Sequence, residues 1–138
     1  MPFKYYIDAD INCVLIQHSD PFKMEEMNAQ FQMIFADLEF AGNTNILRDC
    51  SDAALPSDWT WERMTTTTKE RNQIFNEKLG RYKVAWVVRD GKDFAKIHQY
   101  SVSDRFGHHD VERRVFRDMA EARKWLEIPD DYVIDIPD

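Results

Sequence analysis

The chain of 138 residues contains only four glycines, at positions 42, 80, 91 and 107. Three of them stand where we expect a helix to end, and Gly91 stands in an expected strand-to-helix turn. No glycine is left to build a phosphate-binding loop, and the sequence contains neither G-x-G-x-x-G nor G-x-x-x-x-G-K. The scarcity of glycine therefore argues against nucleotide binding through either of these loops.

Cysteine, positive charge and long apolar runs are also scarce. Cys13 and Cys50 form no C-x-x-C pair, which favours reduced thiols and a cytoplasmic protein. The 18 Lys and Arg residues are outnumbered by 25 Asp and Glu, and the net charge of −7 argues against a nucleic-acid partner. No stretch reaches the roughly 18 apolar residues of a membrane span. Asp8 and Asp10 stand where a signal peptide would need its apolar core.

Short apolar runs alternate along the chain with amphipathic segments, and 43% of the residues are hydrophobic. We expect strands at 5–7, 11–16, 45–50, 82–88 and 114–116, and helices at 22–40, 59–79, 93–105 and 118–126. This alternation predicts one α/β domain over residues 1–128, with a mostly parallel sheet of four to five strands flanked by about four helices. The tail 129–138 lies outside the pattern and is expected either to form an edge strand or to pack on the domain.

The expected helices have recognisable beginnings. Asp20 is expected to cap the first helix with Pro21 at its first position, Ser57 or Asp58 to cap the second, and Asp118 the last. The first helix has apolar residues at three- and four-residue steps, which predicts one buried face made of Met24, Met27, Phe31, Ile34, Phe35 and Leu38. Its polar residues are expected to face solvent for the most part: Glu25, Glu26, Gln30, Asp37 and Glu39.

Ligands of open α/β sheets bind beyond the carboxyl ends of the parallel strands. The residues expected at that edge are His18, Ser19, Asp20, Asp49, Cys50, Ser51, Asp52, Arg89, Asp90 and Lys92. Four aspartates near one edge could hold Mg²⁺, but helix capping and ordinary loop roles account for them more simply. We therefore expect no metal site there.

Histidine and cysteine give little support for catalysis. His108 and His109 are adjacent, so in an extended loop they point to opposite sides, and a solvated loop is favoured over a metal site. Cys50 would need a histidine base to act as a nucleophile, with only His18 near enough in this fold, and a small buried residue is the simpler interpretation. No G-x-S-x-G elbow is present, and His98 stands alone. No catalytic residue and no cofactor are expected.

The Met- and Phe-rich first helix allows a second hypothesis. Methionine is adaptable and is frequent on surfaces that bind apolar ligands. A pocket for a small apolar or lipid-like ligand could lie between this helix and the sheet, lined by Met27, Phe31, Trp61 and Met64. Ordinary core packing of the same residues is the simpler alternative.

Four segments of the chain resemble a known family. The segments YYIDADINCVLI, NILRDCSDAALP, GRYKVAWVV and VFRDMAEARKWLEI are similar to the SpoIIAA-like (STAS-like) bacterial domains, in the branch with a CRAL-TRIO-related fold. The most specific is V-F-R-D-x-x-E-A-x-x-W-L at 115–126, and the resemblance spans about residues 4 to 127. It implies a mixed sheet whose first strand is antiparallel to its neighbour, and a family that is not generally enzymatic.

The resemblance also marks a regulatory edge and one departure from the family. Anti-sigma-factor antagonists of the family are phosphorylated on a serine in a D-S-S-G turn, where this chain reads L-P-S-D-W at 55–59. The residues expected at the regulatory or partner-facing edge are Asp49, Ser51, Ser57 and Asp58. We expect a regulatory or protein-interaction module that binds another protein or a second copy of itself. The alternative is the binder of a small apolar ligand.

Overall fold

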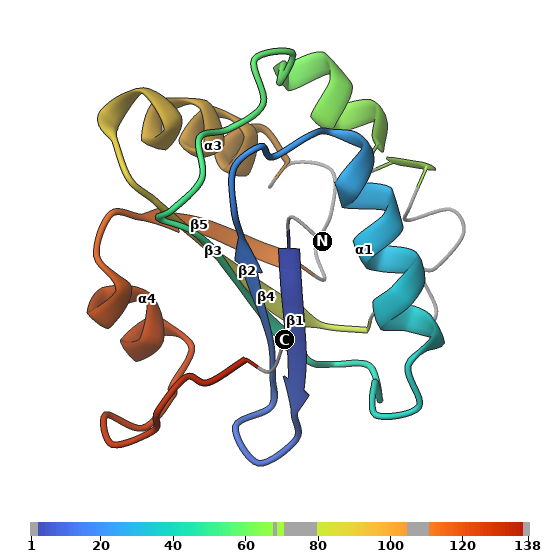
Figure 1. Ribbon diagram of the computed structural model, residues 1–138, viewed down its shortest axis with the longest axis vertical. Coiled ribbons are helices and arrows are strands. Elements are labelled where there is room, and N and C mark those ends of the chain that lie inside the picture. Colours follow the sequence, from blue (N-terminus) through green and yellow to red (C-terminus); the bar gives the residue numbers. More distant parts are fainter. Residues whose placement is uncertain (1–2, 68, 71–79, 105–110, 137–138) are drawn as a thin grey trace.

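A computed structural model of the protein describes residues 3–67, 69–70, 80–104 and 111–136 (Figure 1). It contains one five-stranded sheet in the order β1-β2-β3-β4-β5. β1 is antiparallel to β2, and every other neighbouring pair is parallel. The predicted α/β class with a mixed, mostly parallel sheet is confirmed. The strands are β1 (Phe3–Asp8), β2 (Cys13–His18), β3 (Asn45–Cys50), β4 (Tyr82–Val88) and β5 (Val111–Phe116).

Helices cover both faces of the sheet. The helices are α1 (Glu25–Ala36), α3 (Gly91–Asp104) and α4 (Met119–Trp125), with a further helical segment at 61–67 and 69–70. Side chains of α1, α3 and the 61–70 segment share one core cluster with one face of the sheet. Side chains of α4 and of the tail pack on the other face (Figure 1). In the described part of the chain, no helix is both long enough and apolar enough to cross a membrane.

The central strands are buried on both faces, which explains their nearly continuous apolar sequences. On β4, Val84, Trp86 and Val88 face the α1 and α3 side, whereas Ala85 and Val87 face the α4 side. β3 alternates in the same way, and its second, fourth and sixth residues lie on the α1 and α3 side. This places Arg48 inside the core, where it is 1% exposed.

Helix α1 differs from the prediction at both ends. It begins at Glu25 rather than directly after Pro21, and Asp20 does not cap it, because the Asp20 carboxylate accepts a hydrogen bond from the Ala54 backbone N–H at 3.0 Å. It ends at Ala36, well before Gly42. The prediction that Leu38 is buried is wrong: Leu38 lies beyond the helix end and is 99% exposed.

The apolar face predicted for α1 is otherwise confirmed, with Met24, Met27, Phe31, Ile34 and Phe35 all buried. Two polar residues expected at the surface are buried as well. The Glu26 carboxylate accepts a hydrogen bond from the backbone N–H of Lys23 at 3.2 Å, and Gln30 contacts buried polar side chains of the sheet. The buried face is therefore wider than the apolar pattern indicates.

The starts of the other helices confirm one expectation and correct two. Asp118 caps α4 by accepting from the Ala120 N–H. The helical segment that begins at residue 61 is capped by Thr60, not by Ser57 or Asp58. The Thr60 Oγ1 accepts a hydrogen bond from the Arg63 backbone N–H at 3.1 Å. α3 begins at Gly91 instead of Asp93. The expected helix over 71–79 and the loop with Gly107 lie outside the described residues.

The tail contains no strand within residues 129–136. The Tyr132 hydroxyl donates a hydrogen bond to Asp8 Oδ2 at 2.7 Å, which joins the tail to the end of β1. Ile134 and Ile136 pack against the core cluster on the α4 side of the sheet. The tail therefore extends the cover that α4 begins.

Candidate functional site

The carboxyl ends of β2, β3 and β4 lie side by side, as the parallel pairing requires. Asp20 connects the loops that follow these strands. One oxygen of its carboxylate accepts from the Ala54 N–H, and the other lies 3.7 Å from Nη1 of Arg89 in an exposed ion pair. The loops after all three strands therefore meet at one aspartate.

Asp49 and Ser51, two of the residues predicted at this edge, interact with each other. Asp49 Oδ1 accepts from the Ser51 backbone N–H at 3.0 Å and from the Ser51 hydroxyl at 2.6 Å. Ser51 is exposed, but its hydroxyl proton already points to the carboxylate. This pair shapes the turn that leaves β3.

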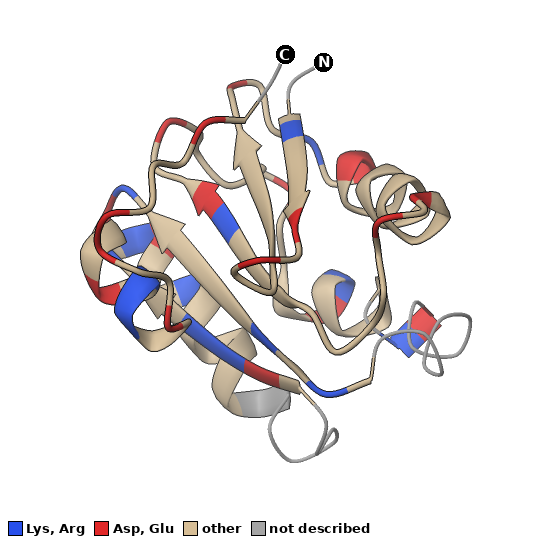
Figure 2. Ribbon diagram, turned by 90° about the horizontal axis from the view of Figure 1, so that it is seen from below, with Lys and Arg blue, Asp and Glu red and all other residues tan. Residues whose placement is uncertain are grey.

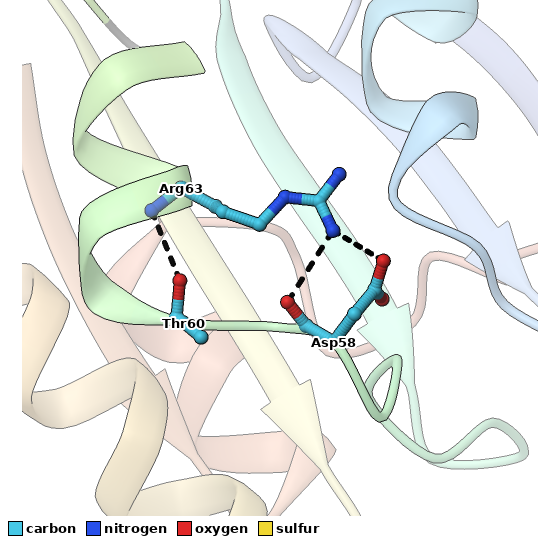
Figure 3. Close-up of polar contacts among 3 residues, drawn as sticks. All are labelled: Asp58, Thr60 and Arg63. Carbon is cyan, nitrogen blue, oxygen red and sulfur yellow. Dashed lines mark hydrogen bonds and ion pairs between the residues drawn. The ribbon is translucent and has the colours of Figure 1, made fainter.

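Asp58 belongs to a second local group with Thr60 and Arg63 (Figure 3). The Arg63 guanidinium forms an ion pair with the Asp58 carboxylate, and its Nη1 lies 3.5 Å from the Asp58 backbone oxygen. About half of each charged side chain is exposed, 49% for Arg63 and 55% for Asp58. Ser57, also exposed, directly precedes this group.

Two tryptophans of the same segment have opposite environments. Trp59 is 5% exposed and meets the Tyr100 ring edge-on, with the ring centroids 6.3 Å apart. Trp61 is 41% exposed, although we expected it to line an apolar pocket. The carboxyl edge thus presents a large aromatic side chain in the same turn as the Asp58–Arg63 pair.

A small cavity lies between α1 and the sheet, where the apolar pocket was predicted. Its volume is about 10 Å³, which is about the space of one water molecule. Neither Trp61 nor Met64 is among the described residues that line it; these are Met27, Phe31, Ile46, Arg48, Tyr82, Val84, Trp86, Tyr100 and Arg113. A ligand larger than water would have to displace these side chains.

Arg48, His18 and Gln30 form a buried polar cluster beside this cavity. Arg48 Nη1 lies 3.0 Å from His18 Nε2 and 2.5 Å from Gln30 Oε1. The guanidinium also lies over the rings of Trp86, at 4.9 Å, and Phe31, at 5.4 Å. Burial and, secondly, the Arg48 charge hold the pKa of His18 well below its usual value, so its ring is neutral and can accept from Arg48.

Arg48 is not among the residues that the sequence predicts for a site. A signal is nevertheless present, because Arg48 alternates in step with Ile46 and Cys50 in the expected strand and so must share their face. His18, expected at the carboxyl edge of the sheet, is fully buried and stacks on Phe22 with centroids 4.1 Å apart.

Both thiols are free and buried. Burial raises the pKa of the Cys13 thiol to about 12 and raises the pKa of Cys50 further. Both are therefore protonated at neutral pH and are poor nucleophiles as they stand. No group of three or more His, Cys, Asp or Glu residues in the described ranges is placed to hold a metal ion. The segment 108–110 lies outside those ranges, and the exposed His98 stacks on Phe94.

Comparison of the chain with protein-family models, with curated proteins and with solved structures gave no match. The resemblance to the SpoIIAA-like domains therefore stays a prediction from the sequence.

Proposed function

We propose that the protein is a non-enzymatic, SpoIIAA-like interaction module of the cytoplasm. It binds a protein partner through Ser57, Asp58, Trp61 and Arg63, which we call the carboxyl-edge surface; Asp49 and Ser51 lie where the chain leaves β3, at the same end of the sheet. The observation that carries this proposal is Trp61, a large aromatic side chain that is 41% exposed in the same turn as an exposed ion pair. The two free thiols support a reducing compartment.

The residue types on this surface are those that dominate binding energy in protein interfaces. Trp and Arg are enriched among the few residues whose truncation costs most of the affinity. Trp59 fills the core, so the fold has a separate tryptophan for packing, and Trp61 is free to contact a partner. Residues 49–63 contain four acidic side chains and one cationic side chain, which favours a partner with basic groups.

Ser57 is the better candidate for regulation on this surface. It is exposed and next to Asp58, whereas the Ser51 hydroxyl already donates to Asp49. A phosphate on Ser57 would add negative charge beside Asp58 and compete for the Arg63 guanidinium. Phosphorylation there would alter the charge that the partner meets.

The test compares partner capture from a cell lysate by the wild-type protein, by Trp61→Ala and by Met33→Ala. Met33 is a matched control, because it is similarly exposed at 37% but lies on α1. A captured protein would then be purified, and we expect Trp61→Ala to weaken its binding about 30-fold, as truncation of a dominant interface residue does. Equal binding by Trp61→Ala and the wild type would refute this surface.

A further inference from the structure

β5 is the last strand of the sheet and pairs with β4 alone among the described strands. Four consecutive residues of this strand, which point alternately to both faces, line an open groove of about 570 Å³. The groove is also lined by Phe94, His98, Ser101 and Val102 of α3 and by Trp125 of α4. Because its lining comes from both faces of the sheet, the groove follows the outer edge of β5.

The surface around this groove differs in charge from the chain as a whole. The protein has a net charge of −7. Figure 2 nevertheless shows Lys and Arg gathered on α3, β5 and α4, at the β5 end of the sheet. On β5 itself the order is Val111, Glu112, Arg113, Arg114, Val115. Val111, Arg113 and Val115 are buried toward α3, while Glu112 and Arg114 are exposed on the other face.

This order is complementary to itself in an antiparallel pair. If Arg113 of one copy lies opposite Arg113 of a second copy, Val111 lies opposite Val115 and Glu112 lies opposite Arg114. The twofold axis produces each of these pairs twice, and residues directly opposite share a face with Cβ atoms about 5 Å apart. Apolar side chains then meet apolar side chains, and opposite charges meet on the exposed face.

Both arginines of β5 contact aromatic rings of their own copy. The register places Arg113 opposite Arg113, its one like-charge pair, and the guanidinium lies over the Tyr100 ring of its own copy, at 5.3 Å. The Arg114 guanidinium lies 5.2 Å from the Phe116 ring and 5.6 Å from the Trp125 ring. It is thereby held on the face where Glu112 of the second copy would arrive.

Side chains of α3 at the rim of the groove can also contact the second copy. Val102 is 39% exposed, and Phe94 stacks with His98 at a centroid distance of 6.0 Å. The same residues of the second copy would face them across the twofold axis. Pairing along β5 would therefore also cover apolar surface on α3.

We infer that β5 pairs antiparallel with β5 of a second copy, with Arg113 at the twofold axis, so that the two sheets continue into one another. Charges on an edge strand ordinarily prevent pairing, but here their order makes the strand complementary to itself. This surface is separate from the carboxyl-edge surface, so the inference does not depend on the proposed function.

Charge exchange tests the pairing on the full chain, with the dissociation constant of the dimer measured by sedimentation equilibrium. Glu112→Arg and Arg114→Glu each turn both cross-strand pairs into like-charge pairs, and we expect each to weaken the dimer roughly 30-fold. An equimolar mixture of the two variants restores opposite charges in the heterodimer and should recover the affinity. The double variant that carries both substitutions also has opposite charges in each cross-strand pair, so it should dimerise with about the wild-type affinity.

Glu121→Arg and Lys124→Glu make the same changes of net charge at exposed positions of α4 and should leave the dimer intact. The inference is overturned if the wild-type chain is monomeric at about 100 μM, if either β5 variant dimerises as the wild type does, or if the mixture stays monomeric. Circular dichroism of each variant checks that the fold is kept.

Discussion

Arg48 Nη1 donates a hydrogen bond of 3.0 Å to Nε2 of His18, and both side chains are almost fully excluded from solvent. Arginine stays protonated in proteins, so it must be the donor and the imidazole nitrogen must be free of its proton. The contact joins the centre of β3 to the end of β2, and Gln30 extends it to α1. Protonation of His18 would therefore disrupt contacts among three elements of the fold.

The stability of the fold should depend on pH through His18. The folded pKa is lowered, whereas the unfolded histidine titrates near 6.5, so only the unfolded chain takes up this proton as the pH first falls below 6.5. The contribution of the neutral, buried His18 to stability is therefore present above about pH 6.5 and decreases as the pH falls below that value. Between pH 7.5 and 5.5 we expect His18 to account for a loss of about 1.4 kcal/mol in the free energy of unfolding.

The measurement is urea unfolding of the wild type and of His18→Gln at several pH values. Carboxylates titrate in both proteins and cancel in the difference, so the wild-type curve should fall more steeply toward low pH. Two parallel curves would contradict a buried neutral histidine.

Gln30→Leu should destabilise the protein although it places an apolar residue in the core. The substitution removes the acceptor that lies 2.5 Å from Arg48, and loss of a buried hydrogen bond to a charged group costs about 2 to 3 kcal/mol. Gln32→Leu makes the same change at an exposed position of α1 and should shift the free energy of unfolding by less than about 0.5 kcal/mol. Equal effects in urea unfolding would show that Gln30 is not part of the cluster.

The two thiols should resist modification in the folded protein. With a pKa of about 12, roughly one in ten thousand Cys13 thiols is ionised at pH 8, and both cysteines are inaccessible to solvent. An aromatic disulfide reagent should therefore label them only as fast as the protein opens, and at once in denaturant. Immediate labelling of either thiol in the native protein would be inconsistent with this burial.

Tyr132→Phe should loosen the tail. It removes the 2.7 Å hydrogen bond to Asp8, and we expect a loss of about 1 kcal/mol and faster amide hydrogen exchange over residues 129–136. Tyr6→Phe is the control, since its ring is 40% exposed on the neighbouring β1. Unchanged amide exchange of the tail in Tyr132→Phe would mean that the packing of Ile134 and Ile136 is enough to keep the tail on the sheet.

Local sequence patterns predicted some helix caps correctly and others incorrectly. Capping preferences identified Asp118 correctly, but they chose Ser57 or Asp58 where Thr60 is the cap, because several capping residues follow one another in that segment. The pattern also placed Trp61 on the buried side of this segment, which is wrong, because Trp59 is buried and Trp61 is 41% exposed. Trp59 precedes the helical segment and packs against Tyr100 of α3, a contact between residues distant in the chain that a local pattern does not contain.

The sequence by itself determined the fold class and most strand positions, because period-two and unbroken apolar runs report directly on burial within a sheet. β3 and β4 have the predicted bounds, whereas β2 lies two residues later than predicted and β5 begins three residues earlier. Only the tertiary structure decided the polar interior. Arg48, His18 and Gln30 come from three different elements of the chain, and their polar atoms are paired with one another inside the core. Burial of such groups is a property of their mutual contacts, so it appears only when the chain is folded.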